Sequence, residues 1–469
     1  MTETSLLGLR TVSSSAHRGT GQPVKMPARA PHSTRRIWQG LGAIAIAASL
    51  VGGCVNTKYR TGAPAQSFVA ADEPRAAEIG RDIIAQGGKA GDAATSMAMA
   101  MAVTLPSRVG MTGGGVCVVF DAAKKETRTL DFLPRSVGAG GAAQPGFLRG
   151  VYALQAATGA MRWEQAVVPA EQLARSTPVS RALARDLADS AARLSADPEA
   201  RRVFLPTGAP LAEGAPLSQP ELAASLSQVR RSGIAAMYGG PLGGAVAQAA
   251  AIDPATIRGF QPRWTGTAAV PLGIVSMHFA QLPETNNGAA LTAAWNATAD
   301  LPSDQRAARV AQALGATGNG ASTPGAGLVV IDHEENGVAC SFTMGAPFGT
   351  GRMVPGTGLL GARGVDGAGF GAPALLTNAI VGRTQFAGAA SAAGNDGPAA
   401  APAALLSAAL PAALDKEPGA AIRVSRAANG PGRATFITCQ TSMESGWKEC
   451  QIAADPRAHA LGILVETER

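Results

Sequence analysis

The stretch from Asp72 to Asp121 reads DEPRAAEIGRDIIAQGGKAGDAATSMAMAMAVTLPSRVGMTGGGVCVVFD. Apolar residues between positions 76 and 84 recur at helical spacing, and Gly87-Gly88 follows as a stop signal, so the first part predicts an amphipathic helix. The part between Asp92 and Pro106 is apolar on every side, which predicts a buried helix. Because a strand rather than a helix follows the glycines at 113–115, they predict a tight turn with close backbone packing and not a phosphate cradle.

Working outward from this stretch, the rest of the chain combines helices with pairs of strands. Residues 150–251 are mostly helical in pattern, and a strand-like segment lies around Leu272–Phe279. Further along, GLVVID and VACSFTM predict two strands joined by the turn HEENG. Strand pairs flanked by helices fit an α+β layered arrangement better than alternating βα units.

The N-terminal region carries an export signal. Arg35-Arg36 precede an apolar segment, residues 37–53, which is too short to span a bilayer, and Val51-Gly52-Gly53-Cys54 resembles a lipobox. We therefore predict a lipoprotein signal peptide over residues 1–53 and lipidation of Cys54. An uncleaved N-terminal anchor is the alternative, and either interpretation exports the remaining chain. The start is Met1 or Met26, because PARAPHSTRR after Met26 would make an ordinary basic region.

Residues 54–72 are polar and small without any period, and they are interpreted as a tether between the lipid and the folded part. The prediction is a membrane-anchored lipoprotein that faces the periplasm. Because Val55 rather than Asp follows Cys54, the outer membrane is favoured over the inner membrane.

The charge of the chain gives no reason to expect a nucleic-acid partner. The formal net charge is +7, but six of the 40 Lys and Arg residues and only one of the 33 acids lie in residues 1–53, so the remainder carries +2. We see no clustered basic stripe that would serve as an electrostatic footprint for nucleic acid.

Four cysteines remain beyond the lipobox. Cys439 and Cys450 lie on two strand-like segments joined by a polar turn, so a disulfide across a hairpin is expected, with two unpaired thiols as the alternative. Cys117 and Cys340 lie within apolar runs and are expected to be buried, unpaired small hydrophobic residues. No CxxC or histidine-associated spacing supports a metal site, and no cofactor is expected.

Residues 72–121 are similar, almost position for position, to the opening of γ-glutamyltransferases, in which a helix, a glycine turn, a buried helix and a glycine-started strand follow in this order. WEQAVVPAEQLARSTPVSRALARDL (163–187) and SFTMGAPFGTG (341–351) also resemble that family, as does AADPRAHALG near the end. The resemblance implies a four-layer αββα sandwich of the N-terminal nucleophile (Ntn) hydrolase type. Residues 73–322 would be large-subunit-like and residues 323–469 small-subunit-like parts of one layered domain.

The resemblance also implies a nucleophile, which this sequence does not supply. The family's precursor cleaves itself before a Thr that becomes the nucleophile, seven residues ahead of a turn Asp. Counting back from Asp332 leads to Gly325, which has no hydroxyl. Thr323 or Ser322 would serve only if the chain carries an insertion, and Pro324 follows Thr323 directly.

Other positions of the family's site differ as well. The Arg that grips the substrate carboxylate corresponds to Leu133, and Arg135 lies two residues later as the remaining candidate. A helper Thr is retained as Thr343, whereas the Asn two residues on is Gly345. Asp366 is the candidate for the acid that holds the substrate amine.

Two further pairs depart from the pattern. The paired serines map to Ala374 and Leu375, and the Gly-Gly pair of the oxyanion hole maps to Ser391-Ala392. The first hypothesis is therefore a non-catalytic family member with a binding or scaffold role. It would take a γ-glutamyl compound or a small peptide as its ligand, and its protein partner is unknown. The second is an active γ-glutamyl hydrolase, transpeptidase or other Ntn amidase that uses Thr323 or Ser322, and an unrelated fold is the third.

Overall fold

The computed structural model describes residues 65–137, 141–285, 287–315, 322–365, 372–393, 396–397, 399–415, 432–441 and 448–467. Its first part contains β1 (Ala65–Ala71), α1 (Pro74–Ala85), α2 (Ala90–Thr104), β2 (Gly114–Asp121), β3 (Glu126–Asp131), β4 (Ser136–Val137), β5 (Ala142–Ala143), α3 (Phe147–Thr158), α4 (Trp163–Arg175) and β6 (Thr177–Pro178). Next come α5 (Arg181–Leu194), α6 (Pro198–Phe204), β7 (Pro216–Leu217), α7 (Pro220–Ser232), α8 (Ala235–Tyr238), α9 (Pro241–Ala250) and α10 (Pro254–Gly259).

The second part begins with β8 (Arg263–Thr265), β9 (Thr267–Leu272), β10 (Val275–Ala280), α11 (Asn287–Thr298) and α12 (Ser303–Ala313). It continues with β11 (Ala326–Ile331), β12 (Gly337–Thr343), β13 (Met353–Val354), β14 (Leu359–Leu360), β15 (Ala374–Asn378) and β16 (Arg383–Ser391). The chain then forms α13 (Ala400–Leu410), a π-helical turn (Pro411–Asp415), β17 (Arg433–Thr441), β18 (Lys448–Ala453) and β19 (Leu461–Thr467).

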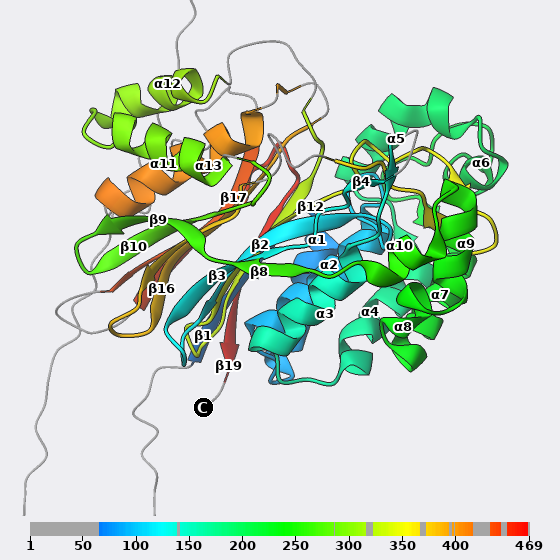
Figure 1. Cartoon of the computed structure of the whole chain (residues 1–469), viewed down its shortest axis with the longest axis horizontal. Helices are drawn as coiled ribbons and strands as arrows, with labels where there is room; N and C mark the ends of the chain where they lie inside the picture. Colours follow the sequence, from blue (N-terminus) through cyan, green and yellow to red (C-terminus); the bar gives the residue numbers. More distant parts are fainter. Residues whose placement is uncertain are drawn as a thin grey trace, which may run out of the picture. The chain divides into compact units, whose positions relative to one another are not determined.

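Two antiparallel sheets form the centre of the described part of the chain. One has seven strands in the order β19-β1-β11-β12-β2-β3-β8, and the other has six in the order β18-β17-β16-β15-β10-β9. Helices α1 to α3 pack on the outer side of the first sheet, α5 to α10 lie beyond them at the right of the view, and α11 to α13 cover the outer side of the second sheet (Figure 1). The order of layers is therefore αββα, as the resemblance to γ-glutamyltransferases implies.

Each of the three interfaces between these layers has its own apolar core. The core between α1, α2 and the seven-stranded sheet includes Met97, Met101 and Cys340, all fully buried. The core between the sheets includes Phe120 and Leu375. Both faces of each sheet are covered, so the central strands β1, β11, β12 and β15 are almost entirely buried and show little alternation of polar and apolar residues, whereas the edge strands β8, β9 and β19 are partly exposed.

The deciding stretch folds as its pattern predicts. Every residue of α2 is buried, and Gly87 after α1 adopts a φ of +89°. The glycine run packs closely against backbone: a Cβ added at Gly114 would lie 2.1 Å from the carbonyl oxygen of Phe132. Any side chain there would collide with the backbone, so this glycine is required by packing.

The tether was predicted over residues 54–72, but the folded part begins earlier than its predicted end. Residues Ala65–Ala71, which were assigned to it, form β1, a buried strand between β11 and β19. Its sequence AQSFVAA consists mainly of small residues and is covered on both faces, so it lacks the period-two pattern by which a half-exposed strand is identified. Cys54 and the signal segment lie outside the described residues.

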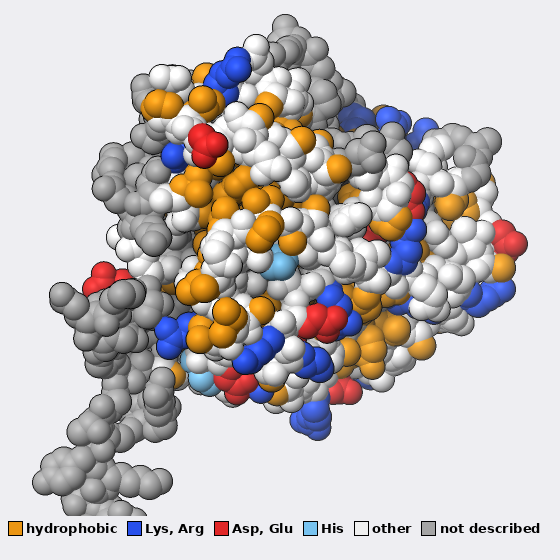
Figure 2. Space-filling model, turned by 60° about the vertical axis from the view of Figure 1, so that its left-hand side comes forward, with side chains coloured by type: hydrophobic (Ala, Val, Ile, Leu, Met, Phe, Trp, Pro, Cys, Tyr) orange, Lys and Arg blue, Asp and Glu red, His pale blue; other side chains and the backbone are white. Residues whose placement is uncertain are grey.

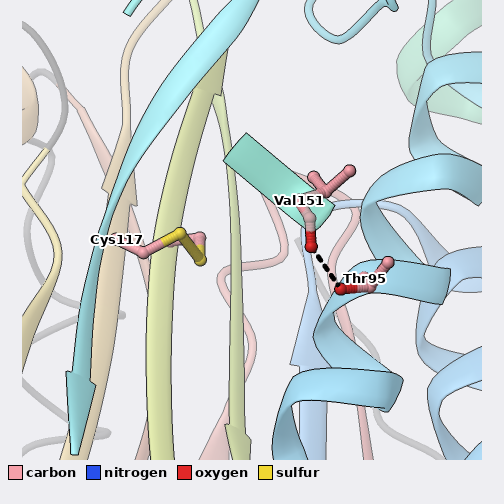
Figure 3. The surroundings of a disulfide bond; sticks show 4 residues. Thr95, Cys117 and Val151 are labelled. Atoms are coloured by element: carbon pink, nitrogen blue, oxygen red, sulfur yellow. Dashed lines mark hydrogen bonds between the residues drawn. A yellow bond between two sulfur atoms is a disulfide. The ribbon is translucent and has the colours of Figure 1, made fainter. Parts of the chain in front are cut away.

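Both remaining cysteine pairs are disulfides. Cys439 and Cys450 face each other on β17 and β18 and are bonded, as expected. Cys117 and Cys340 are fully buried, as expected, but the expectation that they are unpaired was wrong: they lie opposite each other on β2 and β12 and form a second disulfide, 223 residues apart in sequence. Figure 3 shows this bond near α2, where the hydroxyl of Thr95 donates to the carbonyl oxygen of Val151 at 3.0 Å.

The described surface has no continuous stripe of one charge on the face drawn in Figure 2, where blue and red side chains lie intermixed among white and orange ones. Within the described ranges, no helix is both long enough and apolar enough to cross a bilayer.

Candidate functional site

The peptide between Pro324 and Gly325 lies where β11 begins, at the position that the family resemblance assigns to the nucleophile. The N–H of Gly325 donates to the carbonyl oxygen of Ala392 at 3.3 Å. The hydroxyl of Thr343 donates to the carbonyl oxygen of Pro324 at 2.7 Å and accepts from the N–H of Gly345 at 2.8 Å. The side chain of Thr343 thus contacts the carbonyl of the residue that precedes Gly325.

Asp72 is the main polar link around this junction. Its carboxylate accepts from the N–H of Gly327 at 2.8 Å, from the hydroxyl of Ser391 at 2.8 Å and from that of Thr435 at 2.7 Å. Burial raises the pKa of Asp72, and these three donors oppose that rise. Because Gly327 belongs to one sheet and the two hydroxyls to the other, Asp72 joins the two sheets beside Gly325.

A cavity of about 250 Å³ opens beside Pro324. It is lined by Arg108, Asp186, Asp189, Ser190, Pro324, Pro347 and Ala393. Arg108 is only 4% exposed and donates to the two carboxylate oxygens of Asp186 at 2.8 and 3.0 Å. Burial lowers the pKa of Arg108, but the charge and the hydrogen bonds of Asp186 raise it by more, so the pKa of Arg108 stays above its ordinary value. The cavity therefore has a charged wall beside Pro324.

Arg135, the candidate carboxylate clamp, is engaged elsewhere. Its guanidinium contacts Asp131 at 2.6 Å and Glu284 at 2.7 Å, and Arg263 binds the same two acids. The hydrogen bond from Arg263 is the largest cause that lowers the pKa of Glu284 to about 2. Arg135 does not belong to the lining of the cavity, so the structure does not bring it to the junction.

Glycine at 345 is a steric requirement. Its φ is +76°, and an added Cβ would lie 2.0 Å from the carbonyl oxygen of Arg363. The family's Asn has no room at this position in the present backbone. Leu133, to which the sequence resemblance assigns the position of the family's Arg, is fully buried in the core between the sheets.

The remaining predicted residues have different surroundings. The hydroxyl of Ser322 donates to the carbonyl oxygen of Ala393, and Thr323 is half-buried two residues before Gly325. Ala374 and Leu375 are fully buried on β15. Asp366 lies outside the described residues. In the described ranges, no group of three His, Cys, Asp or Glu residues is arranged to hold a metal ion.

Sequence reasoning missed three residues of this site, Asp72, Arg108 and Asp186. The one visible signal was Arg108, a charged residue that directly follows an apolar helix within TLPSRVGMTGGG. Asp72 and Asp186 are ordinary in their local sequence, and their partners lie far along the chain.

Comparisons with known proteins identify the family of the chain. The sequence model described as Gamma-glutamyltranspeptidase matches residues 76–138 and 134–314, which is about half of the chain. The chain belongs to the gamma-glutamyltranspeptidase family. It is 32% identical over 197 residues to a glutathione hydrolase proenzyme from Bacillus subtilis and 32% identical over 212 residues to the acylase ACY 1 proenzyme from a Pseudomonas species.

Both sequence alignments cover only part of this chain and only part of each relative. The two alignments cover 37% and 39% of this chain and 33% and 38% of the relatives, so the matched region spans about a third of their length. The crystal structure of cephalosporin acylase from Bacillus halodurans superimposes with a TM-score of 0.68 and 16% sequence identity, over 86% of this chain and 96% of that one. This likeness shows that the fold is that of an Ntn hydrolase.

Proposed function

We propose that this protein is a catalytically degenerate member of the gamma-glutamyltranspeptidase family that retains a binding or scaffold role. The observation that carries the proposal is Gly325, which lies at the start of β11 where the family's nucleophile is expected. The hydroxyl of Thr343 donates to the carbonyl oxygen of Pro324, and this carbonyl belongs to the peptide bond that an active precursor would cleave. Without a hydroxyl or thiol at 325 there is no atom to attack that carbonyl, and later none to attack a substrate.

The test is electrophoresis of the purified chain under denaturing conditions, together with an assay of γ-glutamyl anilide hydrolysis. We expect one uncleaved species and no release of aniline. Gly325→Thr alone should not restore turnover, because Leu133 and Gly345 still replace the substrate-holding Arg and Asn. Since one relative is an acylase, an N-acyl substrate belongs in the same assay.

The alternative is an active amidase whose nucleophile is Thr323 or Ser322. N-terminal sequencing of any fragment distinguishes the non-catalytic hypothesis from the active-amidase hypothesis. A fragment that begins at one of these residues, with turnover abolished by alanine at that residue, would overturn the proposal. The Thr343→Ala variant is a useful companion, because it should slow self-cleavage only if the junction is active.

We propose further that the protein is exported and anchored to a membrane through Cys54. The lipobox-like VGGC motif supports this, and so do the two disulfides, since disulfides persist in oxidising compartments. Cys54→Ala should shift the protein from the membrane fraction to precursor or soluble material. Unchanged fractionation and unchanged mass would contradict the lipid anchor.

A further inference from the structure

The most exposed large apolar side chains of the described residues lie at two neighbouring hairpin tips. Ile274 is 69% exposed at the turn between β9 and β10, and Ile380 and Val381 are 66% and 58% exposed at the turn between β15 and β16. Strand β10 pairs with β15, with Ser276 opposite Thr377, so the two tips are adjacent. Exposed apolar side chains that gather in one place mark an interaction surface.

Contacts with the other sheet hold the β15–β16 tip in position. The ammonium group of Lys125, in the turn between β2 and β3, donates to the carbonyl oxygen of Ile380 at 2.7 Å. The hydroxyl of Thr384 donates to the carbonyl oxygen of Glu335, in the turn between β11 and β12, at 2.8 Å. The apolar tips and these two turns therefore lie at the same end of the sheets.

The first strand of the fold begins at this end. In the register of β1 with β11, Phe68 lies opposite Ile331, the last residue of β11, so Ala65 lies beyond that residue, beside the turn to β12. The ends of β1, β3 and β16 lie together at the lower left of Figure 1. Because Ala65 follows Cys54 by eleven positions (65 − 54), the chain between them spans at most about 40 Å.

The charged side chains at this end suit a lipid surface that carries no net charge. Lys124, whose side chain is 63% exposed, is paired with Asp121 at 2.6 Å, and Lys89 is paired with Glu334 at 2.6 Å. Since both ammonium groups have a carboxylate partner, attraction to anionic lipids is small and the apolar tips supply most of the attraction. A lysine beside apolar tips can keep its charge among lipid headgroups while its stem lies along apolar surface.

We infer that this end of the two sheets rests on a phospholipid membrane, with Ile274, Ile380 and Val381 inserted among the lipids. The inference rests on the proposed anchor at Cys54, which would keep this end within reach of the membrane. Each aliphatic side chain that moves into lipid should favour the docked state by roughly five- to thirtyfold. The short tether raises the effective concentration of lipid, so docking needs no high affinity in free solution.

The experiment tethers the mature chain to vesicles and measures whether the tips enter lipid. A chain that begins at Val55 with an N-terminal hexahistidine tag is bound to phosphatidylcholine vesicles that contain a nickel-chelating lipid. Ala379→Cys carries the fluorophore NBD beside the apolar tips, and Thr207→Cys carries it in an exposed turn after α6 as the control. The other cysteines of this chain form disulfides, so the fluorophore reacts at one site. Spin-labelled phosphatidylcholine quenches a fluorophore that enters the acyl region.

We expect quenching by lipid at position 379 and none at position 207. The combined variant Ile274→Ser, Ile380→Ser and Val381→Ser should lower the ratio of docked to undocked chain by about a hundredfold or more. Tyr152→Ser, which replaces an exposed apolar side chain on α3, should leave this ratio unchanged. Circular dichroism establishes that each variant is folded. Absence of quenching at position 379, or equal quenching in the combined variant, would overturn the inference.

Two further measurements separate the remaining outcomes. A dimer in size-exclusion chromatography that the combined variant loses would assign the tips to a contact between two copies and overturn the membrane inference. Mass spectrometry of the chain isolated from cells tests the anchor by itself. An unmodified Cys54 would refute the anchor, whereas quenching of the tagged chain still decides whether the tips enter lipid.

Discussion

Removal of the Cys117–Cys340 disulfide should destabilise the protein more than removal of the hairpin disulfide. The two bonds close loops of very different length, with sequence separations of 223 and 11. The chain-entropy estimate assigns about 5 kcal/mol to the longer loop and about 3 kcal/mol to the shorter one. Because Cys117 and Cys340 are also fully buried between α2 and the sheet, their replacement removes core contacts as well.

The assay compares two double variants, Cys117→Ala with Cys340→Ala and Cys439→Ala with Cys450→Ala, by urea unfolding followed through tryptophan fluorescence without reductant. A loss of about 5 kcal/mol is a large part of the stability of most domains, so the first variant should unfold at a much lower urea concentration. The reasoning is refuted if the hairpin variant loses as much stability, or if the first variant loses less than about 1 kcal/mol.

Three other outcomes follow from the described contacts. Burial raises the pKa of Glu73 to about 7 from an ordinary 4.5. The unfolded chain therefore loses this proton first, and stability should fall by about 3 kcal/mol as the pH rises from about 4.5 to about 7. Urea unfolding at several pH values measures this dependence of stability on pH. Glu73→Gln should remove it and Glu78→Gln should leave it unchanged. If the dependence persists in Glu73→Gln, another group causes it. Asp72→Ala leaves three buried donors unpaired and should cost about 3 kcal/mol or more, whereas Asp82→Ala on the exposed side of α1 should cost almost nothing; similar losses in denaturation would contradict the role of Asp72. Gly345→Asn should destabilise by about 2 kcal/mol or more through its clash, and Gly208→Asn, also at positive φ but in open space, serves as the control for backbone strain; equal melting temperatures would rule out the clash.

The local sequence pattern was sufficient to predict those features that depend only on residues close together in the chain. The helices at α1 and α2, the strand pair β11 and β12, and the hairpin that carries Cys439 and Cys450 all follow from periodicity and turn residues within short windows. Counting back from the turn at Asp332 along one strand also places Gly325 directly before β11. Thr343 could be placed for the same reason, because the strand pairing of β11 with β12 sets it beside the junction.

The sequence by itself determined the family, the order of elements and the absence of a hydroxyl at 325. Only the tertiary structure decided that β1 lies between β11 and β19, that Cys117 bonds Cys340, and that Arg108 pairs with Asp186. The physical reason is that these contacts join segments up to several hundred residues apart. Nothing in the spacing of a local window specifies the partner of a distant side chain; the packing of the two sheets against each other does.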